Sequence, residues 1–164
     1  MNKVTLLLGC NIGERLLNLE KAEQEISVLL GKIIQRSSVY ETAPWGNTSQ
    51  GNFLNSVIVI ESFYSANEIM TKIIFIEEAM GRVRTKKWEA RVIDIDILFF
   101  NDEIISTENL TVPHPGLHLR KFTLIPLVEL MPSFIHPVFK KTVTELLSDL
   151  NDPLEVKKFS THLC

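Results

Sequence analysis

The sequence contains little cysteine and no long hydrophobic run. Its two cysteines, Cys10 and Cys164, form no C-x-x-C pair, which excludes a zinc ribbon and a redox-active dithiol of that type. So few cysteines are typical of a protein from a reduced compartment. The apolar run at residues 4–8 is too short for a membrane span or for the core of a signal peptide. We therefore expect a soluble, cytoplasmic protein with no membrane partner.

Several signature motifs of nucleotide-binding and hydrolytic proteins are also absent. No G-x-x-x-x-G-K-[ST] phosphate loop occurs, and the segment from Gly9 to Gly13 lacks the G-x-G-x-x-G spacing of a dinucleotide fold. H-E-x-x-H and G-x-S-x-G do not occur either. The chain has 17 lysines and arginines against 20 acidic residues, for a net charge of −3. Because the charge balance is slightly acidic, no nucleic-acid partner is expected.

The composition is otherwise that of an ordinary globular protein. The chain has 164 residues, of which 45% are hydrophobic and 23% are charged. A chain of this size buries roughly 70% of its unfolded surface, so it can form a core without disulfides or metals. The sequence therefore predicts one domain over residues 1–164.

The hydrophobic pattern predicts alternating strands and helices. Strands are expected at residues 4–8, 33–41, 53–62 and 92–100, and helices at 15–30, from Ser65 to Gly81, and at 142–150. The order β-α-β-β-α-β predicts an α+β protein with a ferredoxin-like antiparallel sheet and helices on one face. A proline-rich segment and the last helix form an appended C-terminal segment. A doubly wound parallel fold is disfavoured because no helix separates strands 33–41 and 53–62.

The strand at residues 92–100 carries two aspartates, Asp94 and Asp96, between isoleucines. Successive side chains of a strand point to opposite faces, so the two carboxylates share one face and lie roughly 6.6 Å apart at the backbone. They could hold a hard cation, and Mg²⁺ is the natural occupant because it takes one or two carboxylates and binds substrate phosphates with the rest of its shell. A half-exposed strand with a solvated acidic face is the alternative.

A basic segment precedes these aspartates, at residues 81–91. It carries five basic residues and one acidic residue, Glu89; the basic residues are Arg82, Arg84, Lys86, Lys87 and Arg91. Arginines bind phosphate oxygens in a bidentate manner, so a basic segment beside two carboxylates suits a metal-bound nucleoside triphosphate. Trp88 adds a flat surface on which a ring could stack. The alternative is a solvated basic loop that only neutralises the aspartates.

A third candidate segment runs from Pro113 to Phe122. His114 lies between two prolines, which places it in a rigid loop, and Arg120 and Phe122 follow. His114 could donate a hydrogen bond to a phosphate oxygen. It could equally cap backbone carbonyls nearby.

These segments, taken together and in order, resemble the 6-hydroxymethyl-7,8-dihydropterin pyrophosphokinase family. The matching stretches are L-G-C-N-I-G-E-R, Y-E-T-A-P-W-G, F-L-N-S-V, I-E-E-A-M-G-R-V-R, K-W-E-A-R-V-I-D-I-D-I-L, V-P-H-P and R-K-F-T-L-I-P-L. The resemblance implies an ATP-dependent transfer of diphosphate to the hydroxymethyl group of the pterin, with release of AMP, in folate biosynthesis. It also implies two magnesium ions, a monomeric enzyme, and small-molecule partners, namely ATP and the pterin.

The resemblance implies roles for individual residues as well. The metal ligands would be Asp94 and Asp96, and the diphosphate in transfer would be handled by Arg82 and Arg91. The residues implied to contact ATP are Glu77, Arg84, Trp88, Arg91, His114 and Arg120. The residues implied to form the pterin pocket are Thr42, Pro44, Trp45, Phe53, Asn55, Trp88 and Phe122. Among these, Asn55 would hydrogen-bond the edge of the pterin, and the pterin ring would lie between the aromatic rings of Trp88 and Phe122.

Two other functions remain open from the sequence. The family usually has Trp-Gly-Pro-Arg where this chain has Glu89 and Ala90 between Trp88 and Arg91. This difference motivates the alternative of a catalytically impaired protein of the same fold that binds ATP or pterin. In a third reading, the arginines and aspartates only neutralise one another in a structural module.

Overall fold

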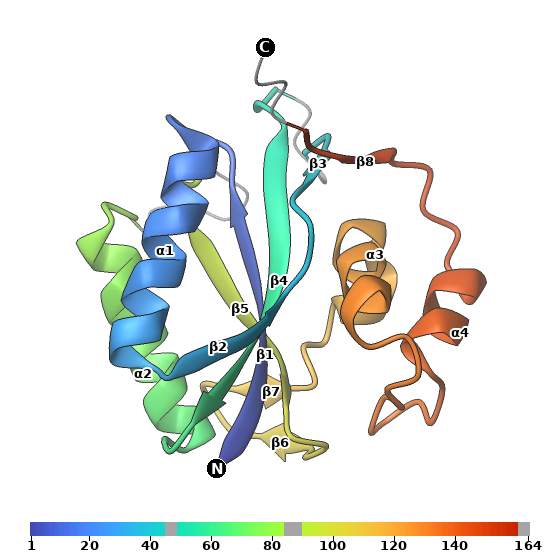
Figure 1. Cartoon of the computed structure of the whole chain (residues 1–164). Coiled ribbons are helices and arrows are strands. Elements are labelled where there is room, and N and C mark those ends of the chain that lie inside the picture. The colour runs from blue at the N-terminus through green and yellow to red at the C-terminus, as the bar shows by residue number, and fades with distance from the viewer. Residues whose placement is uncertain (45–48, 84–89, 161–164) are drawn as a thin grey trace.

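The computed structural model describes residues 1–44, 49–83 and 90–160, and its centre is one antiparallel sheet. The strands are β1 (Asn2–Cys10), β2 (Lys32–Arg36), β3 (Tyr40–Thr42), β4 (Phe53–Ser62), β5 (Asp94–Phe100) and β8 (Val156–Lys158). They lie in the order β5-β1-β4-β3-β8 (Figure 1). β3 pairs with residues 53–55 at the start of β4, and β2 pairs with residues 58–61 of the same strand. With β2 and β3 counted as one irregular strand, this is the predicted ferredoxin-like β-α-β-β-α-β arrangement.

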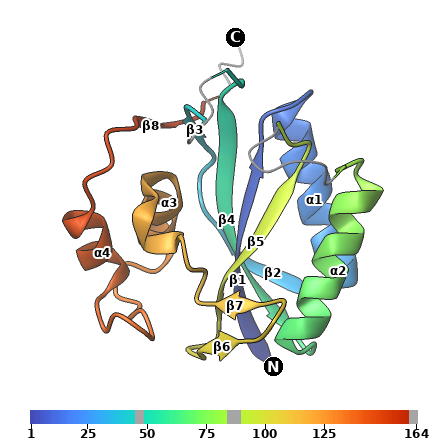
Figure 2. The same cartoon turned by 180° about the vertical axis from the view of Figure 1, so that it is seen from behind.

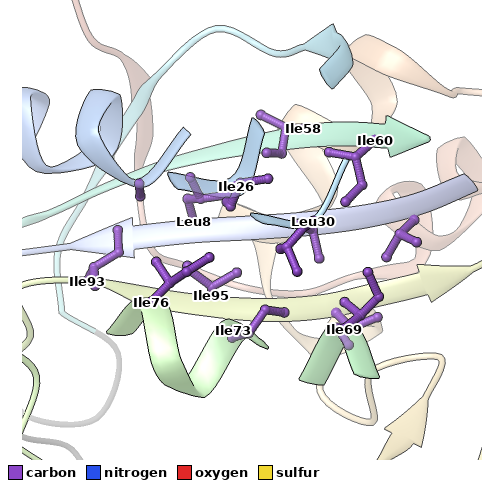
Figure 3. Packing of buried hydrophobic residues seen from close by; sticks show 14 of the residues in the cluster. Leu8, Ile26, Leu30, Ile58, Ile60, Ile69, Ile73, Ile76, Ile93 and Ile95 are labelled. Atoms are coloured by element: carbon purple, nitrogen blue, oxygen red, sulfur yellow. The ribbon is translucent and has the colours of Figure 1, made fainter. Parts of the chain in front are cut away.

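Two helices, α1 (Arg15–Leu29) and α2 (Ala66–Ala79), cover one face of the sheet (Figure 1). A capping box fixes the start of α2, because Ser65 accepts the Glu68 backbone N–H while the Glu68 carboxylate accepts the Ser65 N–H. From there Ile69, Ile73 and Ile76 recur on one side of the helix and are fully buried. Figure 3 shows these side chains packed with those of α1 and the strands. Each such side chain contributes about 1.5–3 kcal/mol by leaving water.

A second layer, absent from the minimal ferredoxin-like pattern, covers part of the opposite face (Figure 2). It consists of a 3-10 turn (Leu117–Leu119), α3 (Lys121–Leu130) and α4 (Val143–Asp149). Its buried leucines pack with residues of β1, β4 and β5 in a separate cluster. The start of α3 and the Asp94 end of β5 both line the pocket of the candidate active site.

The expected strand at residues 33–41 is wrong as a single element, because the chain forms β2 and β3 with a break between them. At the break the Ser37 N–H still donates to the Val57 carbonyl at 2.8 Å, and side chains provide further hydrogen bonds. The Ser37 hydroxyl accepts the Val57 N–H at 2.9 Å, and the Glu129 carboxylate accepts the Ser38 N–H at 2.9 Å. Short polar side chains offer the backbone these alternatives to a regular sheet. Because Glu129 belongs to α3, the break depends on a tertiary contact that periodicity does not reveal.

The C-terminal half contains more regular structure than the sequence predicts. α3 forms although Pro126 lies inside it, and a short hairpin of β6 (Ile105–Ser106) and β7 (Thr111–Val112) precedes it. β8 then pairs with β3 near the end of the chain. Proline is disfavoured within helices, but burial of the apolar side of α3 outweighs that preference here. Within the described residues, no helix is both long and apolar enough to cross a membrane.

Candidate active site

A pocket of about 310 Å³ lies where β1 ends and β4 and β5 begin, at the upper end of the sheet in Figure 1. It opens on the face that carries α3. The described residues that line it are Leu7, Gly9, Thr42, Ala43, Gln50, Phe53, Asn55, Arg91, Asp94, Asp96, His114, Arg120 and Phe122. The volume is at the lower end of the range for small-molecule sites, and the lining combines apolar side chains with a few polar ones.

The two aspartates of β5 point into this pocket from one face of the strand. Asp94 lies opposite Gly9 and Asp96 lies opposite Leu7 in the β1–β5 ladder. The isoleucines that alternate with them, Ile95 and Ile97, are buried on the other face among the residues of α1 and α2. The extra residue Leu98 then interrupts the ladder, because Leu6 pairs with Ile97 and Thr5 with Phe99. The apolar alternation therefore fixes both carboxylates toward the pocket.

A buried ion-pair network supports Asp94 from behind. One guanidinium nitrogen of Arg82, Nη1, donates to Asp94 Oδ1 at 2.7 Å and to Glu77 Oε1 at 2.6 Å. Glu77 is only 1% exposed and also accepts the Ile95 N–H at 2.8 Å. Burial opposes the positive charge of Arg82, but the Asp94 and Glu77 carboxylates outweigh it and raise the pKa of the guanidinium. The network therefore ties α2 to the start of β5.

Arg91 provides a second guanidinium beside Asp94. Its Nη1 donates to Asp94 Oδ2, so the two Asp94 oxygens accept from two different arginines. Arg91 lines the pocket and its side chain is partly exposed, whereas Arg82 is more buried. The arrangement places positive charge directly beside the carboxylate, where an anionic ligand could reach it.

The surroundings of Asp96 compensate a negative charge on its carboxyl group less well than the two arginines compensate that of Asp94. Burial and the neighbouring Asp94 carboxylate raise the pKa of Asp96 to about 7, although Arg120 and Arg91 oppose the shift. A carboxyl group whose charge is disfavoured in this way gains when a cation binds beside it. Two carboxylates on one strand face, one of them poorly compensated, form a donor set that fits Mg²⁺. No cluster of three or more ligating side chains occurs within the described part of the chain.

His114 faces Asp96 from the loop before α3. Its Nδ1 accepts the Gly116 N–H at 3.0 Å, and its Nε2 lies 3.9 Å from Asp96 Oδ2, which is too far for a hydrogen bond. Burial and the positive charge of Arg120 lower the pKa of His114 to about 4. His114 is therefore neutral at pH 7. Since Nδ1 accepts a hydrogen bond, the proton is on Nε2 and is directed toward the pocket as a donor.

An amide and aromatic rings form the side of the pocket on β3 and β4. The Asn55 Nδ2 group donates to Thr42 Oγ1 at 3.1 Å, and both residues are buried. This bond turns the Asn55 carbonyl oxygen toward Gly9, where a β-carbon would lie only 2.6 Å from it. Phe53 and Phe122 also line the pocket. Asn55 is two strands from Asp94, which corresponds to roughly 10 Å at ordinary strand spacing.

The structure brings nine of the predicted site residues to one pocket. These are Thr42, Phe53, Asn55, Arg91, Asp94, Asp96, His114, Arg120 and Phe122. Three others do not line it: Glu77 and Arg82 lie behind Asp94, and Pro44 also falls outside the lining. Trp45, Arg84 and Trp88 lie outside the described residues.

The sequence reasoning missed several pocket residues. The pocket is also lined by four residues that no sequence pattern marks as functional, namely Leu7, Gly9, Ala43 and Gln50. Asn11, just after β1, also connects two of the surrounding segments through its amide. Gly9 and Asn11 both lie within the matching stretch L-G-C-N-I-G-E-R, so the signal was present there, but the spacing alone assigned no chemistry to them.

Comparison with known proteins gives consistent matches over most of the chain. Residues 5–132 match the family described as 7,8-dihydro-6-hydroxymethylpterin-pyrophosphokinase (HPPK). A 2-amino-4-hydroxy-6-hydroxymethyldihydropteridine pyrophosphokinase of Aquifex aeolicus is 42% identical over 145 residues, which are 88% of this chain and 90% of that protein. One of Methylorubrum extorquens is 36% identical over 159 residues, 96% of this chain and 99% of that protein.

The fold is also found among solved structures. Wild-type HPPK-DHPS of Plasmodium falciparum superimposes with a TM-score of 0.74 over 90% of this chain and 43% of that chain, at 22% sequence identity. At this identity the likeness supports the fold, whereas the sequence matches establish the relationship. The chain belongs to the 7,8-dihydro-6-hydroxymethylpterin-pyrophosphokinase family.

Proposed function

We propose that the protein uses this pocket to transfer diphosphate from ATP to 6-hydroxymethyl-7,8-dihydropterin, giving AMP and the pterin diphosphate. Membership of the family supports the reaction. The observation that carries the site assignment is the convergence of two carboxylates on β5 and a buried amide on β4 in a single pocket. Their separation of roughly 10 Å leaves room for a triphosphate at one side and a flat ring at the other.

Asp94 and Asp96 are the residues that would hold magnesium. Bound there, magnesium would neutralise phosphate charge and polarise the phosphoryl oxygens that react. The fit rests on the shared strand face of the two carboxylates and on the poorly compensated charge of Asp96. Family resemblance adds the expectation of two ions and a monomeric enzyme, and the sequence composition adds that of a cytoplasmic protein.

The side chains near the aspartates have the charge and polarity to bind the triphosphate. Arg91 and Arg120 line the pocket and can bind phosphate oxygens in a bidentate manner. Neutral His114 directs its Nε2 proton into the same space and can donate to another phosphate oxygen. Displacement at the β-phosphorus places additional charge on these oxygens. Positioned donors that already face them lower the barrier without further rearrangement.

The side of the pocket on β3 and β4 suits the pterin. Asn55 is held by Thr42, so its amide can present a fixed acceptor and the remaining donor to a ring edge. Phe53 and Phe122 provide flat apolar surfaces. Arg120 also lies with its Cζ 5.9 Å from the Phe122 ring centroid, which brings the arginine and the aromatic side together. A pterin bound here would therefore lie beside the triphosphate.

The proposal is tested by incubating the protein with ATP, Mg²⁺ and 6-hydroxymethyl-7,8-dihydropterin and measuring AMP. We expect equal amounts of AMP and pterin diphosphate. In the Asp96→Ala variant the rate of AMP formation should fall at least a thousandfold while the fold is retained. Asp149→Ala is the matched control, because Asp149 pairs with Lys141 on the exposed surface. Mg²⁺-dependent ATP binding without AMP formation by the wild type would contradict the proposal and indicate a binding protein instead.

A further inference from the structure

Asn11 connects two segments that are distant in sequence and that both contribute to the pocket. It is the first residue after β1 and is partly buried. On one side its backbone and its side chain contact Arg91, which lies between α2 and β5. On the other side its amide contacts Gln50 and Gly51, which lie between β3 and β4. Arg91 and Gln50 both line the pocket.

The contact with Arg91 fixes both backbone polar groups of that residue. Asn11 Oδ1 accepts the Arg91 N–H at 2.7 Å, and the Asn11 N–H donates to the Arg91 carbonyl at 3.0 Å. Three residues later in the chain, Asp94 accepts from the Arg91 guanidinium. With its backbone held by Asn11 and its side chain by Asp94, Arg91 has little freedom of position.

The contact with Gln50 and Gly51 uses the other half of the same amide. Asn11 Nδ2 donates to Gln50 Oε1 at 3.0 Å and to the Gly51 carbonyl at 3.3 Å. The geometry requires one acceptor and two donors on a short side chain, and asparagine supplies that set. Aspartate would present a second oxygen to the oxygens of Gln50 and Gly51, and alanine would make none of these bonds.

We infer that Asn11 is a positioning residue, which holds Arg91 and the segment at Gln50 and Gly51 in one arrangement and so sets the two walls of the pocket relative to each other. Its effect on catalysis rests on the proposed function, because it acts through Arg91 on the transferred phosphates. The pocket can bind both substrates in register only when both segments are held. Loss of the contact with Arg91 should therefore lower turnover, and loss of the contacts with Gln50 and Gly51 should weaken pterin binding.

A double-mutant cycle tests this role. We expect Asn11→Ala to lower kcat at least tenfold at saturating substrates, and to change it less than twofold when introduced into Arg91→Ala. Asn18→Ala is the matched control, because its Nδ2 donates to the Ile12 carbonyl of the same segment at 3.0 Å without contacting Arg91. Its kcat should stay within twofold of the wild type. Independent, multiplicative losses in Asn11→Ala and Arg91→Ala would overturn the inference.

Amide exchange of Arg91, measured by NMR, tests the same role without any turnover. The Arg91 N–H should exchange at least tenfold faster in Asn11→Ala and at the wild-type rate in Asn18→Ala. Asn11→Asp keeps the acceptor for this N–H, so it should preserve slow exchange while raising the pterin KM. Unchanged Arg91 exchange in Asn11→Ala would overturn the positioning role. A wild type that forms no AMP would instead refute the proposed function, and the exchange rates would still decide the role of Asn11.

Discussion

Replacement of Gly9 by alanine probes how closely the pocket is built around Asn55. Gly9 lies in β1 between Asn55 of β4 and Asp94 of β5, directly opposite each in its ladder. A β-carbon there would lie 2.6 Å from Asn55 Oδ1, whereas its next contacts, at 3.7 and 3.9 Å, are ordinary. The Asn55 amide would have to move, and its bond to Thr42 would be lost.

The size of the effect follows from these contacts. Overpacking a buried site costs about 1–3 kcal/mol, and an unsatisfied buried amide costs a similar amount. We expect Gly9→Ala to lower the free energy of unfolding by about 2 kcal/mol. Because the displaced amide is the proposed reader of the pterin edge, the pterin KM should rise about 10- to 100-fold while the ATP KM changes less than threefold. Urea denaturation and steady-state AMP release measure the two effects.

The double variant Gly9→Ala with Asn55→Ala separates the clash from the loss of recognition. Removing the Asn55 amide removes the atom that the new methyl group would meet. The double variant should therefore be about as stable as Asn55→Ala alone, yet its pterin affinity should not recover. Wild-type pterin affinity in Gly9→Ala, or additive losses of stability in the double variant, would refute the reasoning.

Two further predictions concern buried groups. Glu77→Gln removes a charge from the pair with Arg82 and weakens the acceptor for the Ile95 N–H. It should therefore lower the free energy of unfolding, measured by urea denaturation, by about 2–4 kcal/mol. An unchanged denaturation midpoint would contradict the role of this network. His136 is buried, its Nδ1 accepts the Val138 and Phe139 N–H groups, and burial and His118 lower its pKa to about 4. Neutral His136 therefore stabilises the fold fully above its unfolded pKa of about 6.5, and this stabilisation is lost as the pH falls toward 4. The loss amounts to about 3 kcal/mol, because each unit of difference between the folded and unfolded pKa corresponds to about 1.36 kcal/mol. His136→Asn keeps an acceptor that does not titrate, so the free energy of unfolding should fall less between pH 7 and pH 4.5 than in the wild type; an equal fall would contradict the assignment.

The sequence predicts the parts of the site that local pattern controls. Alternation along β5 predicts that Asp94 and Asp96 share a face, and the buried Ile95 and Ile97 on the other face agree with this. The capping box at Ser65 predicts the start of α2 correctly. These features depend on spacing within one element, so periodicity reveals them.

The features that sequence reasoning missed depend on contacts between distant segments. The Glu77 carboxylate accepts the Ile95 N–H across 18 positions, and nothing in the helical pattern of α2 marks one of its acidic residues as buried. Asn11 reaches Arg91 across 80 positions. α3 contains Pro126, which by local preference indicates a break. In each case tertiary packing outweighs or adds to the local preference.

The most direct test of the account is the position of the metal in a crystal of the protein with Mn²⁺ and a non-hydrolysable ATP analogue. Anomalous scattering from Mn²⁺ locates the ion independently of the protein density. We predict a metal within about 2.0–2.3 Å of carboxylate oxygens of both Asp94 and Asp96, close to the Mg²⁺ coordination distance, with the triphosphate on the side of Arg91 and His114. A metal and triphosphate bound away from these two carboxylates would contradict the account.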